Sequence, residues 1–295
     1  MSDLEVRQLR YFVAVAEELH FGRAAERLGM AQPPLSRAIR ELERQLGVRL
    51  LERTTRQVRL TPAGEVLLRD ARTAIEAVSA AGRRAQHAGR PAPGLRLALK
   101  ADYDAGLLPR ILSAFEQEDE AVPVELLLGG RGEQAPALRE GRADVALLPE
   151  PFEPRGLDSE PLLTEPRLLA IAANDPLAAR SSLCLADLRG RTLPDGGAAE
   201  DGGLVLGPEA IRRSTRDLAQ IFNLVEVSGL VWFVPDSLAR RHPRPGIAYR
   251  TVTDLPPVTL FLAWPQDSRS PAVAAFVRAA TAVAAEVASP APVAG

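Results

Sequence analysis

A short run of residues near the N-terminus carries side chains that can read the edges of DNA bases. Gln32 can form two hydrogen bonds with an adenine edge, and Arg37 can contact a guanine edge or a phosphate. Ser36 is short enough for a close contact with a phosphate or a base. Arg40 follows Ser36 after one helical turn and adds a further positive charge. These residue types at this spacing predict that the segment enters a DNA groove.

Helices must position these side chains, and the flanking sequence predicts them. Residues 4–19 carry apolar side chains at helical spacing and predict a supporting helix, and the Ala-rich residues 21–28 predict a second one. Gly29 can end the second helix with a left-handed turn. A third helix is expected to begin near Gln32, because Pro33 and Pro34 are tolerated in a first helical turn. Its expected buried stripe consists of Leu35, Ile39, Leu42 and Leu46.

A basic hairpin is expected after the third helix. Residues 48–51 and 58–60 are brief strand-like runs around the sequence ERTTRQ. Arg53 and Arg56 at its tip can reach phosphates or a neighbouring minor groove. A plain helical hairpin with solvated charges is the alternative, but the ordered set of three helices, glycine turn and basic hairpin favours a helix-turn-helix with a wing.

The charge distribution separates the front of the chain from the rest. Residues 1–90 contain 16 arginines against 11 acidic residues, whereas the remainder contains 20 basic against 27 acidic residues. A basic head on an acidic body is typical of a nucleic-acid-binding domain attached to a different domain. The N-terminus lacks the apolar run of a signal peptide, and no apolar run approaches the ~18 residues of a membrane span. We therefore expect a cytoplasmic protein without a membrane partner.

A long helix is expected to follow the wing. Thr61 suits the N-cap and Pro62 the first turn, and no strong helix breaker occurs before residues 89–91. Small and apolar residues recur in it at alternating spacings of four and three: Leu67, Ala71, Ala74, Val78, Ala81 and Ala85. Such a heptad seam predicts a two-fold dimer, which would read an inverted-repeat operator. Packing of this helix on its own domain is the alternative. Residues 90–94 (RPAPG) are expected to form a hinge.

The body of the chain alternates strand and helix patterns. Strands are expected at 95–100, 122–129 and 144–149, with helices at 106–118 and 133–141 between them, and this order predicts a parallel sheet. A second such set is expected to begin at 168–173. It continues through strands at 192–194, 204–207, 230–235 and 247–252, with a helix at 214–229. A strand at 258–265, a helix at 270–288 and a frayed tail at 289–295 complete the prediction.

The head resembles a known family. The stretch FVAVAEELHFGRAAERLGMAQPPLSRAIRELERQLGVRLLERTTRQVRLTPAG is similar to the winged helix-turn-helix of LysR-type transcriptional regulators. By this resemblance Gln32, Pro33, Ser36 and Arg37 face the groove and Arg56 is the wing residue. The resemblance also implies that 61–89 is the dimerising linker helix, that a dimer or tetramer forms, and that RNA polymerase is contacted.

The body resembles the effector-binding domain of the same family, which is related in fold to type 2 periplasmic binding proteins. The motifs are looser here: GLLP, LREGRADVALL, VPDSLA and LAWPQDSRSPAVAAFV. The expected fold is therefore mixed, with a mainly α winged helix-turn-helix (1–60), a linker helix (61–89), a hinge (90–94) and a two-lobed α/β domain (95–288). Lobe I is expected at about 95–162 and 268–288 and lobe II at about 167–262, with crossovers near 162–167 and 263–268 and a small-molecule effector between them.

The expected effector contacts lie beyond the carboxyl ends of strands, where open α/β sheets bind ligands. They are Lys100, Ala101, Asp102, Gly130, Arg131, Gly132, Pro194, Asp195 and Gly196, with Ser228 where the family has a Gly-rich turn. The family often has a small hydroxyl residue where Asp102 and Arg131 align. Three interpretations therefore stay open: both bind a polar or zwitterionic ligand, they pair with each other, or both are solvated rim charges.

The leading hypothesis is a DNA-binding transcriptional regulator controlled by a small molecule. The alternative is a cytoplasmic solute-binding or sensor protein of the same fold without switching. An enzyme is not expected, because His20, His87 and His242 are scattered and no nucleophile set, phosphate loop or metal spacing occurs. We expect no cofactor, no metal and no catalytic residue. The lone Cys184 excludes a disulfide within one chain.

Overall fold

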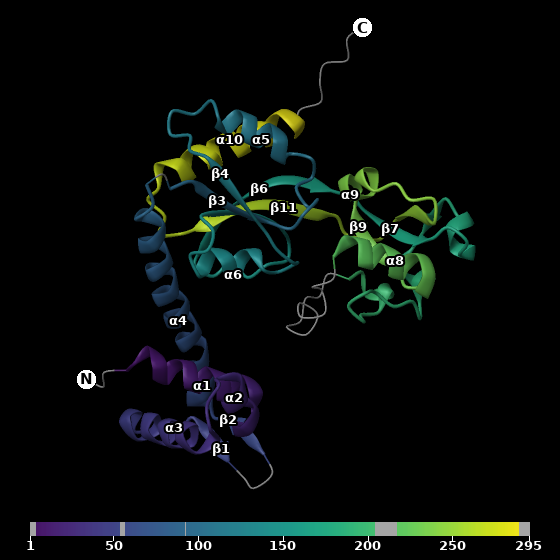
Figure 1. Ribbon diagram of the computed structural model, residues 1–295. Coiled ribbons are helices and arrows are strands. Elements are labelled where there is room, and N and C mark those ends of the chain that lie inside the picture. The colour runs from purple at the N-terminus through teal and green to yellow at the C-terminus, as the bar shows by residue number, and fades with distance from the viewer. Residues whose placement is uncertain (1–3, 54–56, 92, 204–216, 289–295) are drawn as a thin grey trace. The chain divides into compact units, whose positions relative to one another are not determined.

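Short helices and a two-stranded ribbon build the N-terminal unit, Met1–Ala85, in the computed structural model, which describes residues 4–53, 57–91, 93–203 and 217–288. The elements are α1 (Val6–Glu18), α2 (Phe21–Arg27), α3 (Gln32–Leu46), β1 (Leu51–Arg53), β2 (Val58–Leu60) and the long α4 (Pro62–Ala88), seen in Figure 1. The expected glycine turn is confirmed, since Gly29 has a left-handed φ of 64°. The start of α3 at Gln32 is confirmed as well.

The core of this unit explains the spacing of apolar residues in α3. Leu35, Ile39 and Leu42 are fully buried and pack with Phe12 and Val15 of α1. Residues at these intervals share one side of an α-helix, so the polar residues between them face outward. The core therefore fixes which face of α3 is presented to solvent.

The first strand of the wing was predicted wrongly. The structure places β1 at Leu51–Arg53 and not at 48–51, with the antiparallel ladder running from Leu51 opposite Leu60 to Arg53 opposite Val58. The physical reason is Glu43, whose carboxylate accepts hydrogen bonds from the backbone N–H groups of Leu50 and Leu51 at 3.0 and 3.1 Å. The chain before β1 is thus held by α3 and not by the ribbon.

The start of α4 was predicted correctly. The Thr61 hydroxyl accepts a hydrogen bond from Gly64 N–H at 3.0 Å and donates one to the Arg49 carbonyl at 2.8 Å. The first bond caps the helix, and the second attaches it to the segment before β1. Gly64 has no room for a side chain, because a Cβ there would lie 2.1 Å from the Leu50 carbonyl oxygen.

A five-stranded sheet forms the first lobe, lobe I, of the C-terminal unit, Gln86–Gly295. Its order is β4 (Val124–Leu128), β3 (Leu95–Leu99), β5 (Val145–Pro149), β11 (Val258–Pro265) and β6 (Leu157–Glu165). The first three strands are parallel, as predicted, whereas β11 is antiparallel to both of its neighbours.

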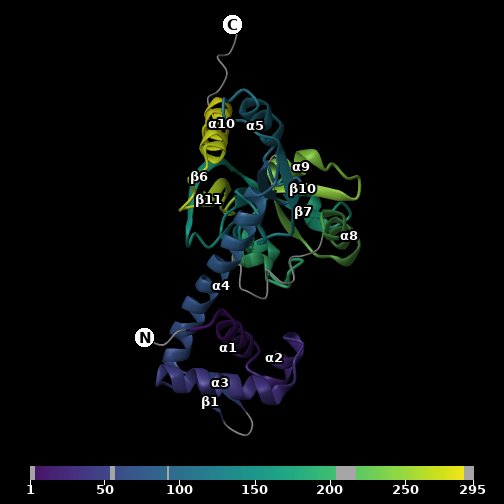
Figure 2. The ribbon, with the colours of Figure 1, turned by 60° about the vertical axis from the view of Figure 1, so that its left-hand side comes forward.

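Alternate residues of these strands face opposite sides of the sheet. Leu97 and Leu147 pack against α5 (Leu108–Phe115) and α10 (Pro271–Ala288), whereas Ala98 and Ala146 pack against α6 (Gln134–Arg139). Figures 1 and 2 show α5 and α10 side by side on one face of the sheet, and Figure 1 shows α6 on the other. By length and composition α10 could cross a membrane, but its apolar residues, such as Phe276, lie in the core of this lobe.

Lobe II is built on a four-stranded sheet in the order β8 (Ser182–Leu183), β10 (Ile247–Val252), β7 (Arg167–Ala172) and β9 (Trp232–Pro235). The expected second parallel set is wrong, because β10 and β9 both pair with β7 in antiparallel fashion. The chain leaves β7 near Ala172 and enters β9 at Trp232, which pairs with Ala170, so the connection returns at the same end of the sheet. Helix α8 (Leu218–Ser228) lies within that connection.

Other details of lobe II also differ from the prediction. The expected strand at 192–194 is reduced to one bridge between Thr192 and Ala198, and the expected strand at 204–207 lies outside the described residues, as does the tail at 289–295. The helix α9 (Asp236–Arg241) was not predicted. Strand β6 occupies much of the expected crossover at 162–167, and the chain passes from lobe I to lobe II at Pro166. The second crossover was predicted wrongly near 263–268, because β11 belongs to the lobe I sheet and the chain returns to lobe I at 253–257, between β10 and β11.

Candidate functional site

The N-terminal half of α3 presents an exposed polar surface. The predicted contact residues on it are Gln32, Pro33, Arg37 and Arg40, which are exposed, and Ser36, which is half-buried. In the described part of the chain, no hydrogen bond or ion pair engages the Arg37 side chain. Arg40 donates one hydrogen bond from Nε to the Ser36 carbonyl at 3.3 Å. The structure therefore brings the predicted groove-facing residues together on one outward face.

The wing residues have a different environment. The Arg53 guanidinium forms an ion pair with Glu43 at 2.9 Å and lies 4.8 Å above the Phe21 ring. These contacts attach the wing to α2 and α3, and they neutralise part of the Arg53 charge. Arg56 lies outside the described residues. The roles of both arginines in phosphate binding stay predictions.

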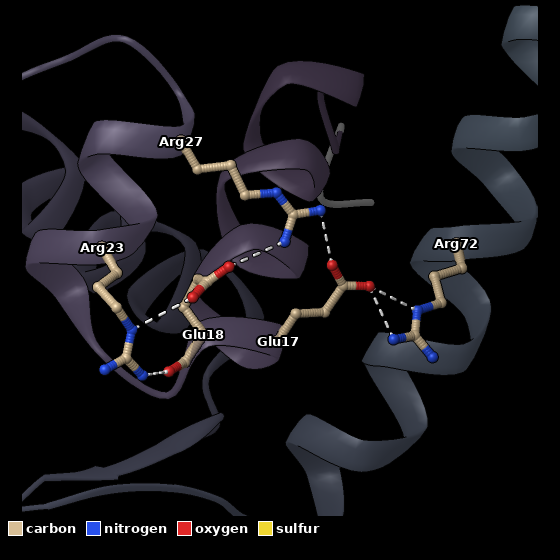
Figure 3. Close-up of polar contacts among 5 residues, drawn as sticks. All are labelled: Glu17, Glu18, Arg23, Arg27 and Arg72. Atoms are coloured by element: carbon tan, nitrogen blue, oxygen red, sulfur yellow. Dashed lines mark hydrogen bonds and ion pairs between the residues drawn. The ribbon is translucent and has the colours of Figure 1, made fainter. Parts of the chain in front are cut away.

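Ion pairs connect the helices behind this surface, as Figure 3 shows. The Glu17 carboxylate lies 2.7 Å from the guanidinium groups of both Arg27 on α2 and Arg72 on α4. Glu18 pairs with Arg23 at 3.3 Å and with Arg27 at 3.4 Å. Burial raises the pKa of Glu17, but hydrogen bonds from the two arginines outweigh it and hold this pKa below its ordinary value. The network fixes α1 against α2 and α4.

A pocket lies where the two lobes of the C-terminal unit meet. It has a cavity volume of about 60 Å³. Lobe I contributes Lys100 and Arg131 from beyond the ends of β3 and β4, and lobe II contributes Arg167 from the start of β7. Apolar and aromatic side chains complete the lining, chiefly Tyr103, Leu193, Ile221, Trp232, Phe233 and Val258. The predicted residues Pro194 and Asp195 line it as well.

Burial makes the basic residues of this pocket unusual. Only 7 % of Lys100 and 7 % of Arg167 is exposed. Burial and, to a smaller extent, the positive charge of Arg131 together lower the pKa of Lys100 to about 8. Burial likewise lowers the pKa of Arg167 to about 10, with a smaller contribution from Arg131. The pocket thus concentrates positive charge in a poorly hydrated place, an arrangement often found at functional sites.

Six predicted effector residues do not line this pocket: Ala101, Asp102, Gly130, Gly132, Gly196 and Ser228. Ala101 is exposed after β3, and Ser228 is exposed at the C-terminal end of α8. Asp102 turns away from Arg131 and pairs with residues of α9 and its C-cap, at 3.2 Å from both Arg241 and His242. Its left-handed φ of 64° reverses the chain directly after β3. Of the three interpretations left open for these two residues, the pairing of Asp102 with Arg131 is therefore not formed.

Sequence reasoning missed Arg167, Tyr103 and the two aromatic residues of β9. Arg167 could have been noticed, because a charged residue at the start of the apolar run RLLAIA needs a special environment. Trp232 and Phe233 stand in the equally apolar run LVWFVP. An apolar pattern of this kind does not distinguish residues that line a pocket from residues of a hydrophobic core.

Comparisons with known proteins agree with both units. The sequence model described as "Bacterial regulatory helix-turn-helix protein, lysR family" matches residues 6–65, and the one described as "LysR substrate binding domain" matches residues 88–285. The chain is 30% identical to the Hca operon transcriptional activator HcaR of Escherichia coli, over 93% of this chain and 96% of HcaR. It is 31% identical to the regulator IlvR of Caulobacter vibrioides, over 94% and 98% of the two chains.

Other relatives match over a shorter stretch. The HTH-type transcriptional regulator AlsR of Bacillus subtilis is 39% identical over 63% of this chain, and the match spans 62% of AlsR. Among solved structures, the LysR family transcriptional regulator CbnR has a TM-score of 0.53 at 29% identity, over 95% of this chain and 99% of CbnR. Full-length BenM has a TM-score of 0.50 at 26% identity, over 98% and 100%.

These matches cover the winged head and most of the two-lobed body. The family predicted from the head is confirmed, and so is the fold class. The chain belongs to the LysR family of bacterial transcriptional regulators.

Proposed function

We propose that this regulator binds double-stranded DNA through the N-terminal half of α3. The observation that carries the proposal is the outward face on which Gln32, Ser36 and Arg37 lie together. An α-helix fits the major groove, where amide and guanidinium groups distinguish base pairs. We assign Pro33 to the same face, and Arg40, Arg53 and Arg56 to phosphates.

We propose further that the chain acts as a homodimer paired along α4. Val78, Ala81 and Ala85 of the heptad seam are exposed in the single chain, and Val78 is 49 % exposed. A second α4 would cover these residues and place two α3 helices on an inverted-repeat operator. Pairs of dimers would give a tetramer. In this arrangement 1–60 binds DNA, 61–89 dimerises, and 95–288 binds the effector after a hinge at 90–94.

The pocket between the lobes is the proposed effector site, with Lys100, Arg131, Pro194 and Asp195 among its contacts. A small molecule that favours one arrangement of lobes or subunits would alter the spacing of the DNA-binding heads. Transcription would change through contact with RNA polymerase, and the site of action is the cytoplasm, where bacterial DNA lies. No catalytic step is needed for this role.

Redox sensing by an internal disulfide is not part of the proposal. The chain contains a single cysteine, Cys184. Its thiol lies 3.2 Å from the Asp187 carboxylate, which also accepts a hydrogen bond from the Cys184 N–H at 2.8 Å. This arrangement caps a short helical turn and gives Cys184 a structural role.

A DNase I footprint on the DNA upstream of the protein's own gene tests the proposed DNA contact. We expect the wild-type chain to protect two inverted half-sites, and Arg37→Ala and Gln32→Ala each to weaken protection at least about tenfold, since a good base contact is worth roughly 1–3 kcal/mol. Arg269→Ala removes an exposed charge from the C-terminal unit and should leave the footprint unchanged. Unchanged footprints for both α3 variants, with intact folding by circular dichroism, would overturn the assignment.

A further inference from the structure

Three positive side chains face the pocket between the lobes without a matching set of carboxylates. Within the described residues, no carboxylate forms an ion pair with Lys100, Arg131 or Arg167. Asp195 is the carboxylate of the lining, and its Oδ1 accepts a hydrogen bond from the Gly197 N–H at 3.0 Å. Among the described residues that line the pocket, three positive groups and one aspartate give a formal net charge of +2.

The other carboxylates near this pocket are engaged elsewhere. Glu150 Oε1 accepts a hydrogen bond from the Thr259 N–H at 2.9 Å. Both carboxylate oxygens of Glu165 accept hydrogen bonds from Ser237 at the start of α9, at 2.7 and 2.8 Å. These contacts hold the two glutamates at the ends of strands. Within the described residues, neither glutamate forms an ion pair with a cation of the pocket. Glu150 raises the pKa of Arg167, but this is the smallest of the three effects that act on that pKa.

Hydrogen-bond donors in the pocket are left unused as well. Arg167 donates from Nε to the Pro256 carbonyl at 2.8 Å and from Nη1 to the Gly202 carbonyl at 2.9 Å, which fixes its guanidinium. In the described chain, Arg167 Nη2 and Arg131 Nε are buried and have no hydrogen-bond partner. Buried donors without partners are costly, so a ligand that accepts from them gains affinity.

The arrangement of the charges defines the chemistry of the ligand. Lys100 lies 4.5 Å above the Tyr103 ring on lobe I, whereas Arg167 stands on lobe II. Arg131 is close enough to lower the pKa of both other cations. The rest of the lining is mainly apolar and aromatic, including Ile221, and suits a short hydrocarbon segment.

The cavity also limits the size of the ligand. A volume of about 60 Å³ is small, since one water needs roughly 10–15 Å³ on this measure. A short ligand therefore suits this volume. A net charge of +2 in a poorly hydrated place matches a ligand that carries two negative charges.

We propose that this pocket binds a short aliphatic dicarboxylate. One carboxylate is held by Lys100 and Arg131 of lobe I and the other by Arg167 of lobe II, so the ligand bridges the two lobes. This inference rests on the proposed function only in naming the pocket as the effector site. Inorganic phosphate also carries negative charge and is the alternative anion in the test below.

Calorimetric titration of the full-length protein at pH 7 tests the proposal. The probes are malonate, succinate and glutarate, with acetate and butyrate as matched monocarboxylates, malonamide as a neutral analogue, and inorganic phosphate. We expect at least one dicarboxylate to bind at least about tenfold more tightly than every other class of probe, since a hydrogen bond to a charged group is worth about 1.5–3 kcal/mol. Equal binding of mono- and dicarboxylates, or tightest binding of phosphate, would show that the proposal is wrong.

Two variants locate the site. Lys100→Met and Arg131→Met should each weaken dicarboxylate binding at least about tenfold, whereas Arg269→Met on the exposed surface should leave it unchanged. Undiminished binding by both pocket variants would contradict the proposal. If a variant fails to fold, the pH dependence of the wild-type protein provides the test. Its affinity for the dicarboxylate should fall between pH 7 and pH 9, because Lys100 loses its proton in this range. An affinity that stays constant would contradict the proposal.

The footprint of the same protein separates this proposal from the proposed function. Absence of dicarboxylate binding together with normal DNA protection overturns the assignment of the ligand and leaves the regulator assignment standing. Dicarboxylate binding without DNA protection overturns the regulator assignment and leaves the assignment of the ligand standing.

Discussion

The Arg241 guanidinium on α9 lies 2.8 Å from a carboxylate oxygen of Asp104, and this ion pair joins the two lobes of the C-terminal unit. Asp104 belongs to the turn after β3 of lobe I, and its side chain is only 5% exposed. The same arginine reaches Asp102 at 3.2 Å. Close to the pocket, the lobes are thus connected by charge as well as by the covalent crossovers.

We predict that Arg241→Gln destabilises the C-terminal unit. Asp104 would keep a hydrogen bond from the Leu108 N–H at 3.3 Å but lose its charged partner. The expected loss is about 2 kcal/mol, because a buried carboxylate loses a charge-assisted hydrogen bond while Arg241 itself is partly solvent-screened. Urea unfolding followed by circular dichroism measures it. Arg240→Gln, whose partner Asp236 lies on the same helix, is the control and should change stability little.

Removal of the buried positive charge in the pocket should stabilise the free protein. Burial lowers the pKa of Lys100 to about 8 from its ordinary value of 10.5, so the folded state disfavours its charged form. Lys100→Met should therefore raise the stability at pH 7 by on the order of 2 kcal/mol, part of the gain being offset by loss of the contact with Tyr103.

The pH dependence of this effect has a definite sign. Between about pH 8 and pH 10.5 the unfolded chain binds the Lys100 proton more tightly than the folded chain, so wild-type stability rises with pH in that window. The advantage of Lys100→Met should then shrink between pH 8 and pH 10.5. Thermal melts of both proteins at pH 7 and pH 10 measure this. If the extra stability of Lys100→Met grew with pH, burial of the Lys100 charge would not be its cause.

Glu17 should stabilise the N-terminal unit above its titration range. Hydrogen bonds from Arg72 and Arg27 outweigh the effect of burial and lower the pKa of Glu17, so its stabilisation is present above pH 4.5 and is lost as the pH falls through the lowered pKa. Glu17→Gln should cost about 1 kcal/mol at pH 7 and nothing once the wild-type carboxylate is protonated. Unfolding from pH 3 to pH 7 provides the test, with the exposed Glu26→Gln as control.

A charge in the heptad seam of α4 should separate the dimer. Val78→Asp would place two like charges opposite each other in the proposed seam, at a cost of about 3 kcal/mol or roughly a hundredfold in the dimer dissociation constant. Thr73→Asp adds the same charge on another side of α4 and should leave the association unchanged. Sedimentation equilibrium distinguishes the two. An unchanged dimer dissociation constant for Val78→Asp would show that the interface does not include this part of α4.

The sequence predicted those elements whose local signals agree with their packing. The start of α3 is set by Pro33 and Pro34, and its buried face by Leu35, Ile39 and Leu42. Strands β10 and β11 have the bounds that were predicted. In each case the periodicity of the side chains and the flanking breakers indicate the same element.

Other elements depend on partners far away in the sequence. Strand β6 contains Pro161 opposite Phe261, and the register shifts between Leu260 and Phe261, so the proline is tolerated on an edge strand at an irregular position. A strand containing proline was not predicted there. The first wing strand is shifted because the Glu43 carboxylate binds two backbone N–H groups, a contact that no local pattern announces.

The candidate pocket was predicted only in part, because some of its residues are placed by contacts with distant parts of the sequence. The rule that ligands lie beyond strand ends found Lys100, Arg131, Pro194 and Asp195. It could not find Arg167, which stands at the start of a strand and reaches the pocket because β7 is antiparallel to both of its neighbours. Asp102 was assigned to the ligand because its pairing with Arg241, 139 residues later, cannot be read from the sequence.

The most direct test is a quantitative footprint on the protein's upstream DNA, made with and without the dicarboxylate that binds best. The wild-type chain should protect two inverted half-sites, and the dicarboxylate should change the affinity or extent of protection. Lys100→Met should protect the same half-sites but no longer respond to the ligand. Absence of half-site protection, or an equal response in Lys100→Met, would contradict a regulator whose DNA contact is controlled from this pocket.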